Sequence, residues 1–200
     1  MRQSELFPSP LPDGCTYREE FLSRDEEREL ISMLQTLPLE HAQYKQFTAL
    51  RRTLSYGSTY DFSANKSLPA PALPAFLYDL RRRIAGWSGL SPESFVHALV
   101  AEYRPGTSLG WHRDVPEFEV IAGISLLSAC RLRLRPYPWI PARRKEIAAV
   151  TLAPRSAYLL RGDARWKWQH SVPPVKELRY SITLRTKRAG TPERGRRSVM

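Results

Sequence analysis

The sequence predicts a mainly β protein with flanking helices, an α+β domain whose core is a sandwich or jelly roll. Helical spacing of apolar residues occurs in two segments, both in the first half of the chain. From Phe95 onward, short apolar or alternating segments are separated by turn residues. Many short strands separated by turns indicate a sandwich or jelly roll rather than a parallel sheet. The 200 residues are enough for one domain with a buried core.

The first helix is predicted to begin after Ser23. Ser23 and Glu26 have the spacing of a capping box. The predicted buried stripe consists of Leu30, Met33, Leu34 and Leu37, and Pro38 ends the helix. Residues 1–14, rich in proline and polar side chains, are expected to lie loosely over the surface.

The second helix is predicted from apolar residues at helical spacing, which are Leu73, Leu77, Leu80, Ile84 and Trp87. Its end is expected near Gly86 or Gly89, because glycine readily adopts the left-handed conformation that closes a helix.

Residues 46–62, which lie between the two helices, combine basic and aromatic side chains around a flexible glycine. Arginine neutralises phosphate and aromatic rings stack on an exposed base, so Arg51, Arg52, Tyr56 and Tyr60 are candidate substrate contacts. The alternative is a β-hairpin whose aromatic side chains pack on the sheet. The residues themselves leave both readings open.

The predicted strands follow in order along the second half of the chain. They are residues 95–103, 120–127, 131–135, 148–152, 156–160, 165–170 and 179–186. In the third of them Leu132 and Leu134 alternate with arginines at 131, 133 and 135, which gives one apolar and one basic face. The loop at 137–145, rich in proline, arginine and aromatic residues, is a candidate second edge of a binding surface.

The charge balance of the chain points to a polyanionic partner. Lys and Arg number 31 against 20 Asp and Glu, a formal net charge of +11 with a pI near 10.0. Such an excess favours nucleic acid phosphates as partners. The alternative is that the arginine content reflects only a GC-rich genome.

Several classes of protein are excluded or disfavoured by the same sequence. Cys15 and Cys130 form neither a disulfide framework nor a zinc-ligand spacing. The first residues lack the apolar segment of a signal peptide, and the longest nearly apolar stretch, 120–130, is too short to cross a bilayer. We therefore expect a cytoplasmic protein without a membrane partner, in a reducing compartment, and most simply a monomer.

Trp111-His112-Arg113-Asp114 is a candidate metal-binding segment. In an extended chain, residues two apart face the same side, so His112 and Asp114 can bind one ion. His170, from a distant predicted strand, supplies a third ligand. Two histidines and one carboxylate, with the remaining positions open, are the ligand set of non-haem Fe(II) oxygenases. Taken singly, each of these residues is more simply a structural histidine or a capping aspartate, as we expect for His41 and His97.

A second pattern near the C-terminus fits the same chemistry. A strand over residues 179–185 places Arg179, Ser181, Thr183 and Arg185 on one face. Two guanidinium groups on one face suit a dicarboxylate such as 2-oxoglutarate, because the arginine fork binds a carboxylate through two hydrogen bonds. An oxygenase iron needs an electron-donating cosubstrate of this kind.

The stretch from Ala98 to Thr186 resembles the AlkB family of Fe(II)/2-oxoglutarate-dependent dioxygenases. A single His-x-Asp pair is a weak signal, whereas the ordered series with its closing arginine strand is specific. The matching pieces are Tyr103-Arg104-Pro105-Gly106, His112-x-Asp114, Ile124-Ser125-Leu126, Trp168-x-His170 and Arg179-Tyr180-Ser181-Ile182-Thr183-Leu184-Arg185.

The resemblance implies a double-stranded β-helix that binds Fe(II) and uses 2-oxoglutarate and O2. The implied metal ligands are His112, Asp114 and His170, the implied 2-oxoglutarate contacts are Tyr103, Arg179, Ser181 and Arg185, and no further catalytic side chain is expected. Residues 46–62 correspond to a substrate lid. The implied domain covers 1–186, with helices and lid in 15–95 and the jelly-roll core in 95–186, followed by a basic, disordered tail at 187–200.

Three positions depart from the AlkB pattern. Ala101 and Ser181 stand where many members have asparagines that position the cosubstrate. Glu117 lies one residue out of register with an acidic residue that DNA-repair members often carry, and it is a candidate contact for a cationic methylated base.

The reaction expected from this resemblance is oxidative demethylation of N-alkylated bases in DNA or RNA, with release of formaldehyde, succinate and CO2. The enzyme then acts on single strands or flips the base out of a duplex. One alternative keeps the iron chemistry but acts on a protein, a tRNA modification or a small molecule. Another, of a different class, is a non-catalytic nucleic-acid-binding module.

Overall fold

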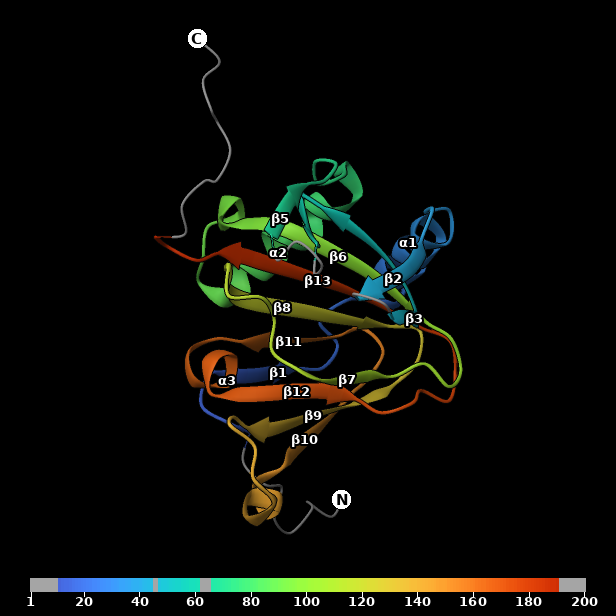
Figure 1. Cartoon of the computed structure of the whole chain (residues 1–200). Helices are drawn as coiled ribbons and strands as arrows, with labels where there is room; N and C mark the ends of the chain where they lie inside the picture. Colours follow the sequence, from blue (N-terminus) through green and yellow to red (C-terminus); the bar gives the residue numbers. More distant parts are fainter. Residues whose placement is uncertain (1–10, 45–46, 62–65, 191–200) are drawn as a thin grey trace, which may run out of the picture.

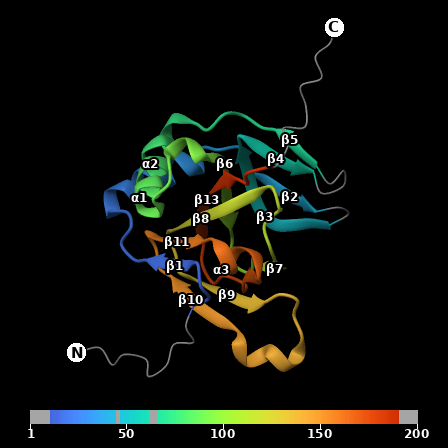
Figure 2. The same ribbon diagram turned by 90° about the vertical axis from the view of Figure 1, so that its left-hand side faces the viewer.

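Two antiparallel sheets form the body of the molecule in a computed structural model that describes residues 11–44, 47–61 and 66–190. The major sheet has seven strands. In spatial order they are β1 (Cys15–Arg18), β11 (Ser156–Leu160), β8 (Phe118–Leu126), β13 (Arg179–Lys187), β6 (Phe95–Tyr103), β3 (Phe47–Tyr56) and β2 (Glu40–Tyr44). The views in Figures 1 and 2 show this sheet on the side of the molecule nearer the two long helices.

The minor sheet has four strands and lies on the opposite side of the molecule, away from the two long helices (Figures 1 and 2). In spatial order they are β10 (Ala148–Leu152), β9 (Cys130–Pro136), β12 (Trp168–Val172) and β7 (Leu109–His112). A separate two-stranded sheet consists of β4 (Ser58–Asp61) and β5 (Lys66–Pro69). The neighbours are antiparallel and mostly non-consecutive in sequence, as in a jelly roll, so the predicted fold class is confirmed.

β13 lies in the middle of the major sheet, and its alternation separates the two faces. Tyr180, Ile182 and Leu184 belong to an apolar core that also contains the buried residues of the two long helices. Arg179, Ser181, Thr183 and Arg185 occupy the other face, toward the minor sheet. The strand therefore supports the helices with its even residues and presents polar groups to the interior between the sheets with its odd ones.

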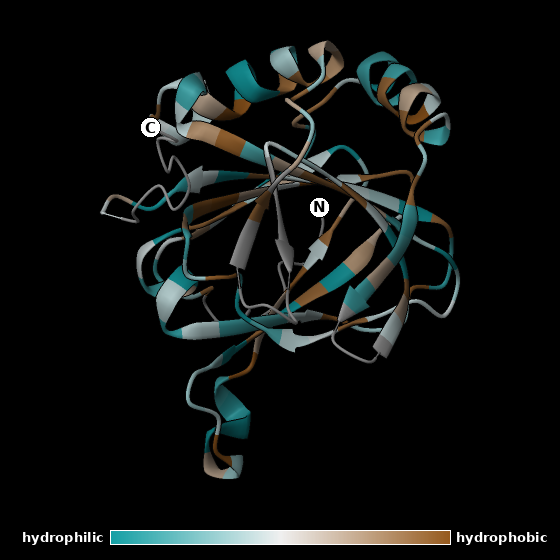
Figure 3. Cartoon of the chain, turned by 45° about the horizontal axis from the view of Figure 1, so that its top comes forward, coloured by the Kyte–Doolittle hydropathy of each residue, from teal (hydrophilic) through white to brown (hydrophobic). Residues whose placement is uncertain are grey.

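The long helices, α1 (Arg24–Gln35) and α2 (Tyr78–Ser88), pack on the outer face of the major sheet (Figure 3). The capping box is confirmed, since the Glu26 N–H donates to Ser23 Oγ and the Ser23 N–H donates to the Glu26 carboxylate. Met33, 45% exposed, was wrongly placed in the buried stripe. The packed face is centred on Leu30 and Leu34, and Met33 points well away from it around the helix.

The end of α2 is also as predicted, because Gly89 closes it with a left-handed φ of 73°. Short 3-10 segments precede and follow the helix, and a third one lies in the loop between β9 and β10. They are η1 (Ala75–Leu77), η2 (Pro92–Ser94) and η3 (Pro141–Glu146). Among the described residues, no helix is long and apolar enough to cross a membrane.

Some elements differ from the prediction. β1 and β2 are edge strands that the sequence pattern did not indicate, and residues 165–170 are not one strand. There, the short helix α3 (Gly162–Trp166) precedes β12. β13 continues to Lys187, one residue into the expected tail, while residues 1–10 and 191–200 lie outside the described part of the chain.

Glu102, on β6, is a buried carboxylate that joins three strands on the helix side of the major sheet. It accepts hydrogen bonds from Arg52 on β3 (3.1 Å), from Arg104 (3.0 Å) and from the Tyr180 hydroxyl on β13 (3.0 Å). Burial alone raises the pKa of Glu102, but the hydrogen bonds from Arg104, Tyr180 and Arg52 outweigh it and leave the pKa below its usual value.

Replacing Glu102 with glutamine is expected to lower the free energy of unfolding by about 1–3 kcal/mol at neutral pH, because two arginines lose their charged acceptor. Since the folded-state pKa is depressed, this stabilisation is fully present above the unfolded-chain value of about 4.3 and is lost as pH falls through the folded value. Urea unfolding at pH 7 and pH 3 tests this. The gap between wild type and Glu102→Gln should shrink in acid, and a gap that stays constant would contradict the assignment.

Candidate metal centre

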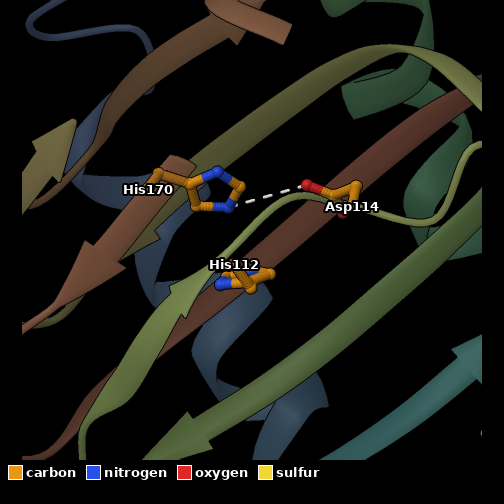
Figure 4. A group of neighbouring side chains, drawn as sticks. All are labelled: His112, Asp114 and His170. Atoms are coloured by element: carbon orange, nitrogen blue, oxygen red, sulfur yellow. Dashed lines mark ion pairs between the residues drawn. The ribbon is translucent and has the colours of Figure 1, made fainter. Parts of the chain in front are cut away.

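Three side chains from the minor-sheet half of the barrel converge at one point. His112 ends β7, Asp114 follows it in the loop, and His170 lies on β12 directly opposite His112 in the strand pairing. Their ligand atoms all lie within 4.8 Å of one another, and His170 Nε2 is 3.6 Å from Asp114 Oδ2 (Figure 4). The extended strand was expected to include Asp114, whereas it stops at His112 and the aspartate is presented by the loop.

The two histidines are in the protonation state that metal binding requires. His112 Nδ1 lies 2.9 Å from the Gly110 carbonyl oxygen, which can only accept, so Nδ1 carries the proton and Nε2 is free for an ion. Burial lowers the pKa of His112, and burial followed by the nearby His112 lowers the pKa of His170 to about 3. Both imidazoles are therefore neutral near pH 7.

Asp114 is held as an anion by Arg185. The Arg185 guanidinium donates from Nε (2.8 Å) and Nη2 (2.6 Å) to Asp114 Oδ1, and its Nη1 lies 3.2 Å from His97 Nδ1. Burial would raise the pKa of Asp114, but Arg185 and the neighbouring His170 hold it well below its usual range. The second carboxylate oxygen remains for the ion, next to His170.

Arg185 has a role that the sequence did not suggest. Its hydrogen bonds go to a metal ligand and to His97, so the residue fixes Asp114, and its predicted contact with the cosubstrate stays a prediction. His97, expected to be structural, is 5% exposed, packs on Phe118 at 4.7 Å between ring centroids, and supports Arg185.

Arg165, on α3, is a positioning residue that the sequence pattern did not reveal. Only 3% exposed, it donates to the carbonyl oxygens of Asp114 (3.2 Å), Val115 (2.7 Å) and Phe118 (2.9 Å). It thus fixes the backbone of the loop that presents Asp114. No motif marks such a residue, because its acceptors are backbone atoms some 50 positions away in sequence.

Arg179 lies at the other end of the inner face of β13. It is 2% exposed, its Nε donates to Ser125 Oγ (3.0 Å), and its guanidinium lies 5.0 Å from the Tyr103 ring centroid. Among the described residues, its terminal amino groups have no hydrogen-bond acceptor. Ser181 lies beside it on β13, paired with Ala101 and Ser125. Arg179, Tyr103 and Ser181 are thus brought together, as their assignment to the cosubstrate requires.

Tyr158, on β11, lines the same interior and was also missed. Its ring crosses Gly123 on β8, where an added Cβ would lie 2.1 Å from Tyr158 Cε1. Burial, and then the charge of Asp114, raises the pKa of Tyr158 above its usual value, so the hydroxyl stays neutral and able to donate. The only sequence sign was a glycine within an apolar strand, which marks a close approach.

Replacing Gly123 with alanine is expected to push the Tyr158 ring aside and to lower the free energy of unfolding by about 1–3 kcal/mol. Gly86→Ala in α2 is the matched control, because a Cβ there meets nothing within 4 Å. Thermal melts compare the two. If Gly123→Ala melts at the wild-type temperature, the close packing of Tyr158 on Gly123 is refuted.

The donor set fits a ferrous ion, and the cationic groups beside it fit 2-oxoglutarate. Two neutral imidazoles and one ionised carboxylate match the ligands of non-haem iron. Arg179 offers unused donors on the inner face of β13, and Arg51 Nε is buried with no hydrogen-bond partner in the described part of the chain. The donors of Arg179 suit a dicarboxylate in this interior, and Arg51 Nε remains for a further polar group there.

The candidate substrate residues of β3 are divided by the alternation of that strand. Arg51 faces the interior, where its Nη1 lies 3.4 Å from the Tyr103 hydroxyl. Arg52 faces the helix side and is bound to Glu102 and to the Leu39 carbonyl oxygen, and Tyr56 is 7% exposed in the helix-side core. The burial of Tyr56 fits the packed-hairpin reading, and the substrate roles of Arg52 and Tyr56 stay predictions.

The remaining two candidate substrate residues are Tyr60 and Glu117. Tyr60 is part of β4, but its side chain lies outside the described residues. Glu117 ends the loop between β7 and β8, and its Oε2 is buried without a hydrogen-bond partner among the described residues. The roles of both remain predictions.

Comparison with known proteins agrees with this geometry. The sequence profile of the 2OG-Fe(II) oxygenase superfamily matches residues 14–190. The mouse alpha-ketoglutarate-dependent dioxygenase alkB homolog 4 is 24% identical over 213 residues, covering 90% of this chain and 68% of the relative. An uncharacterized protein, L905, of Acanthamoeba polyphaga mimivirus is 35% identical over 100 residues, covering 44% of this chain and 46% of its own.

The tRNA (carboxymethyluridine(34)-5-O)-methyltransferase alkbh8 of Xenopus tropicalis is 26% identical over 86% of this chain. The chain spans only about a quarter of that relative (27%) and about half of the viral one (46%).

Two solved structures share the fold. The structure of OsALKBH1 has a TM-score of 0.66 at 15% identity, covering 86% of this chain and 96% of the other. A Pseudomonas putida prolyl-4-hydroxylase has a TM-score of 0.57 at 17% identity, covering 88% and 93%. The profile over residues 14–190 leads to one conclusion: the chain belongs to the 2OG-Fe(II) oxygenase superfamily, it resembles the AlkB-like members of that superfamily, and its His-Asp-His triad fits their Fe(II) site.

Proposed function

We propose that this dioxygenase oxidatively demethylates N-alkylated bases of DNA or RNA. One observation carries the proposal: an AlkB-type iron site occurs in a chain of net charge +11, with Arg51 reaching the interior beside Tyr103. A polynucleotide is the anionic partner that such a charge favours. The names of the relatives support it, since one of them is a tRNA-modifying protein.

When bound, the ferrous ion and 2-oxoglutarate supply the oxidising chemistry, in which the cosubstrate loses CO2 to become succinate and an oxygen atom of O2 enters a substrate C–H bond. The chain orients these reactants. Arg185 and Arg165 hold Asp114 and its loop, while Arg179 and Tyr103 would receive the distal carboxylate of the cosubstrate. Hydroxylation of an N-methyl group gives an N-hydroxymethyl product, which releases formaldehyde and regains the N–H.

A base inside a duplex cannot reach a site between two sheets, so the substrate is a single strand or a flipped base. Within the proposal, Arg51 contacts the substrate beside Tyr103, and Glu117 favours a cationic methylated base. Tyr60 of β4 is the candidate stacking residue.

A substrate panel tests the proposal. N-methylated single-stranded DNA, single-stranded RNA, duplex DNA and a methylated peptide are each incubated with Fe(II), 2-oxoglutarate and O2, and formaldehyde and succinate are measured. We expect equimolar formaldehyde and succinate with at least one oligonucleotide and none without Fe(II). Turnover of the peptide alone would keep the iron chemistry but overturn the nucleic acid substrate.

A further inference from the structure

The outer face of the minor sheet carries a group of arginines interleaved with aromatic rings. Alternation along β9 buries Leu132 and Leu134 and turns the three arginines of the strand outward. We call this group the arginine face; it consists of Trp111, Arg113, Arg131, Arg133, Arg135 and Trp139. None of these residues takes part in the iron site described above.

Two of the arginines are held flat across the sheet. Arg133 Nε donates to Ser171 Oγ (3.1 Å) and Arg135 Nε donates to Gln169 Oε1 (2.8 Å), so both side chains cross β12. Their guanidinium carbons then lie 4.9 Å and 4.5 Å from the centroid of the Trp111 ring on β7. Stacked on an indole and fixed through Nε, each guanidinium keeps its terminal N–H groups for an external acceptor.

Arginine side chains also contact aromatic rings in the loops next to these strands. Arg135 also lies 5.2 Å from the ring of Trp139, in the loop after β9. Arg113 lies 3.8 Å from the ring of Tyr137 and donates to the Trp166 carbonyl oxygen (2.9 Å). Contacts between arginine guanidinium groups and aromatic rings thus continue from β9 to the loop that carries Asp114.

The positive charge here is not compensated. In the described part of the chain, no carboxylate forms an ion pair with any arginine of this face, whereas elsewhere Arg52, Arg155 and Arg185 are each paired. Slight burial, together with the charge of Arg133, lowers the pKa of Arg135. Crowding cations without counter-charges destabilises the free protein, and a bound polyanion would remove that repulsion.

The loop between β9 and β10 extends this surface outward from the body of the molecule (Figure 3). Arg144 and Lys145 of η3 are exposed and form no ion pair within the described residues, while Arg143 is paired with Glu146. Arg131, also exposed, lies at the start of β9.

The arginine face and the iron site share two strands. β7 carries His112 toward the interior and Trp111 outward, and β12 carries His170 inward and Gln169 and Ser171 outward. Arg113 stands between two of the metal ligands in sequence. A long ligand on the arginine face therefore runs past the loop that presents Asp114.

We propose that the arginine face binds the phosphodiester backbone of a nucleic acid strand, outside the pocket that receives the modified base. Planar guanidiniums match phosphate through paired hydrogen bonds, and the flanking rings offer stacking surfaces to unpaired bases. This inference rests on the proposed function, because it adds a second contact for the same substrate class.

Fluorescence anisotropy with labelled, unmethylated oligonucleotides tests the inference on the full chain, with single-stranded DNA, single-stranded RNA and duplex arms. The test variant replaces the three arginines of β9, with Arg131→Ala, Arg133→Gln and Arg135→Gln. The matched control removes the same charge from α1 and α2, with Arg24→Ala, Arg28→Ala and Arg82→Ala, exposed positions on the helix side. Circular dichroism and thermal melts establish that both variants fold.

For the test variant we expect a loss of affinity of at least about tenfold near 0.1 M salt, and a slope of log Kd against log salt shallower by roughly 2–3. The control should lose less than about threefold. Equal losses in the two variants would overturn the inference, as would binding of labelled polyglutamate by a protein that binds no oligonucleotide. If the triple variant unfolds, Arg131→Glu alone decides, because this side chain is exposed and forms no side-chain hydrogen bond or ion pair within the described residues.

Failure of the proposed function is distinguishable from failure of this inference. If the wild-type protein binds strands through the arginine face but demethylates no substrate of the panel, the proposed reaction is refuted and the binding surface is supported. If the wild-type protein demethylates oligonucleotides and the triple variant binds them with unchanged affinity, the proposed reaction is supported and the binding surface is refuted.

Discussion

Alanine in place of His112 is expected to abolish turnover, with succinate formation lowered on the order of 10³-fold or more. Loss of a group that only orients a metal ligand typically costs roughly 10–100-fold, and loss of a ligand itself costs more. His112 supplies its free Nε2 to a site whose other donors are Asp114 and His170, and within the described residues no further ligand joins this group. Succinate release with saturating 2-oxoglutarate, measured across a range of Fe(II) concentrations, gives the effect.

His41→Ala is the matched control for this prediction. His41 is an exposed histidine of β2 whose ring lies 3.0 Å from the Ala49 carbonyl oxygen, far from the triad in the strand order. It should retain wild-type turnover. If wild type and His112→Ala form comparable amounts of succinate, the assignment of His112 as an iron ligand is refuted.

Replacing Arg179 with glutamine is expected to raise the KM for 2-oxoglutarate about a hundredfold, while kcat at saturation changes far less. The guanidinium is buried and oriented by Ser125, so its loss leaves the distal carboxylate of the cosubstrate without a charged partner. Removing a charge-assisted hydrogen-bonding group of this kind costs about 1.5–3 kcal/mol, which is a factor of roughly 10 to 100 or more in affinity. Initial rates over a 2-oxoglutarate series separate KM from kcat.

Arg185→Gln is the internal comparison, because the two arginines share a strand face but contact different protein groups. Arg185 contacts Asp114 and His97, so its loss should weaken Fe(II) binding by roughly 10–100-fold and leave the KM for 2-oxoglutarate nearly unchanged once iron is saturating. If both variants raise the KM for 2-oxoglutarate equally, the two arginines act together on the cosubstrate and the division seen in the structure is wrong.

Much of the fold and the three metal ligands could be predicted from local patterns. The capping box at Ser23, the alternation of β13 and the His-x-Asp spacing each depend on residues a few positions apart, where backbone geometry alone decides what faces what. The order of the motifs along the chain then identified the family, which no single motif could do.

The failures share one physical reason, which is that they depend on strand register and on contacts distant in sequence. Arg51 and Arg52 are neighbours in a basic stretch, and only the pairing of β3 with β6 sends one to Tyr103 and the other to Glu102. Arg165 and Tyr158 act through partners on other strands and carry no motif. Edge strands such as β1 are defined by a partner rather than by their own pattern.

The most direct measurement is an anaerobic titration of the full chain with Fe(II) and then with 2-oxoglutarate, followed by calorimetry and by the visible absorption of the chelated ion. We predict one Fe(II) per chain and saturable 2-oxoglutarate binding whose absorption band requires iron. Both should be lost in Asp114→Ala and His170→Ala. Binding of Fe(II) that these substitutions leave unchanged would contradict a metal centre at His112, Asp114 and His170.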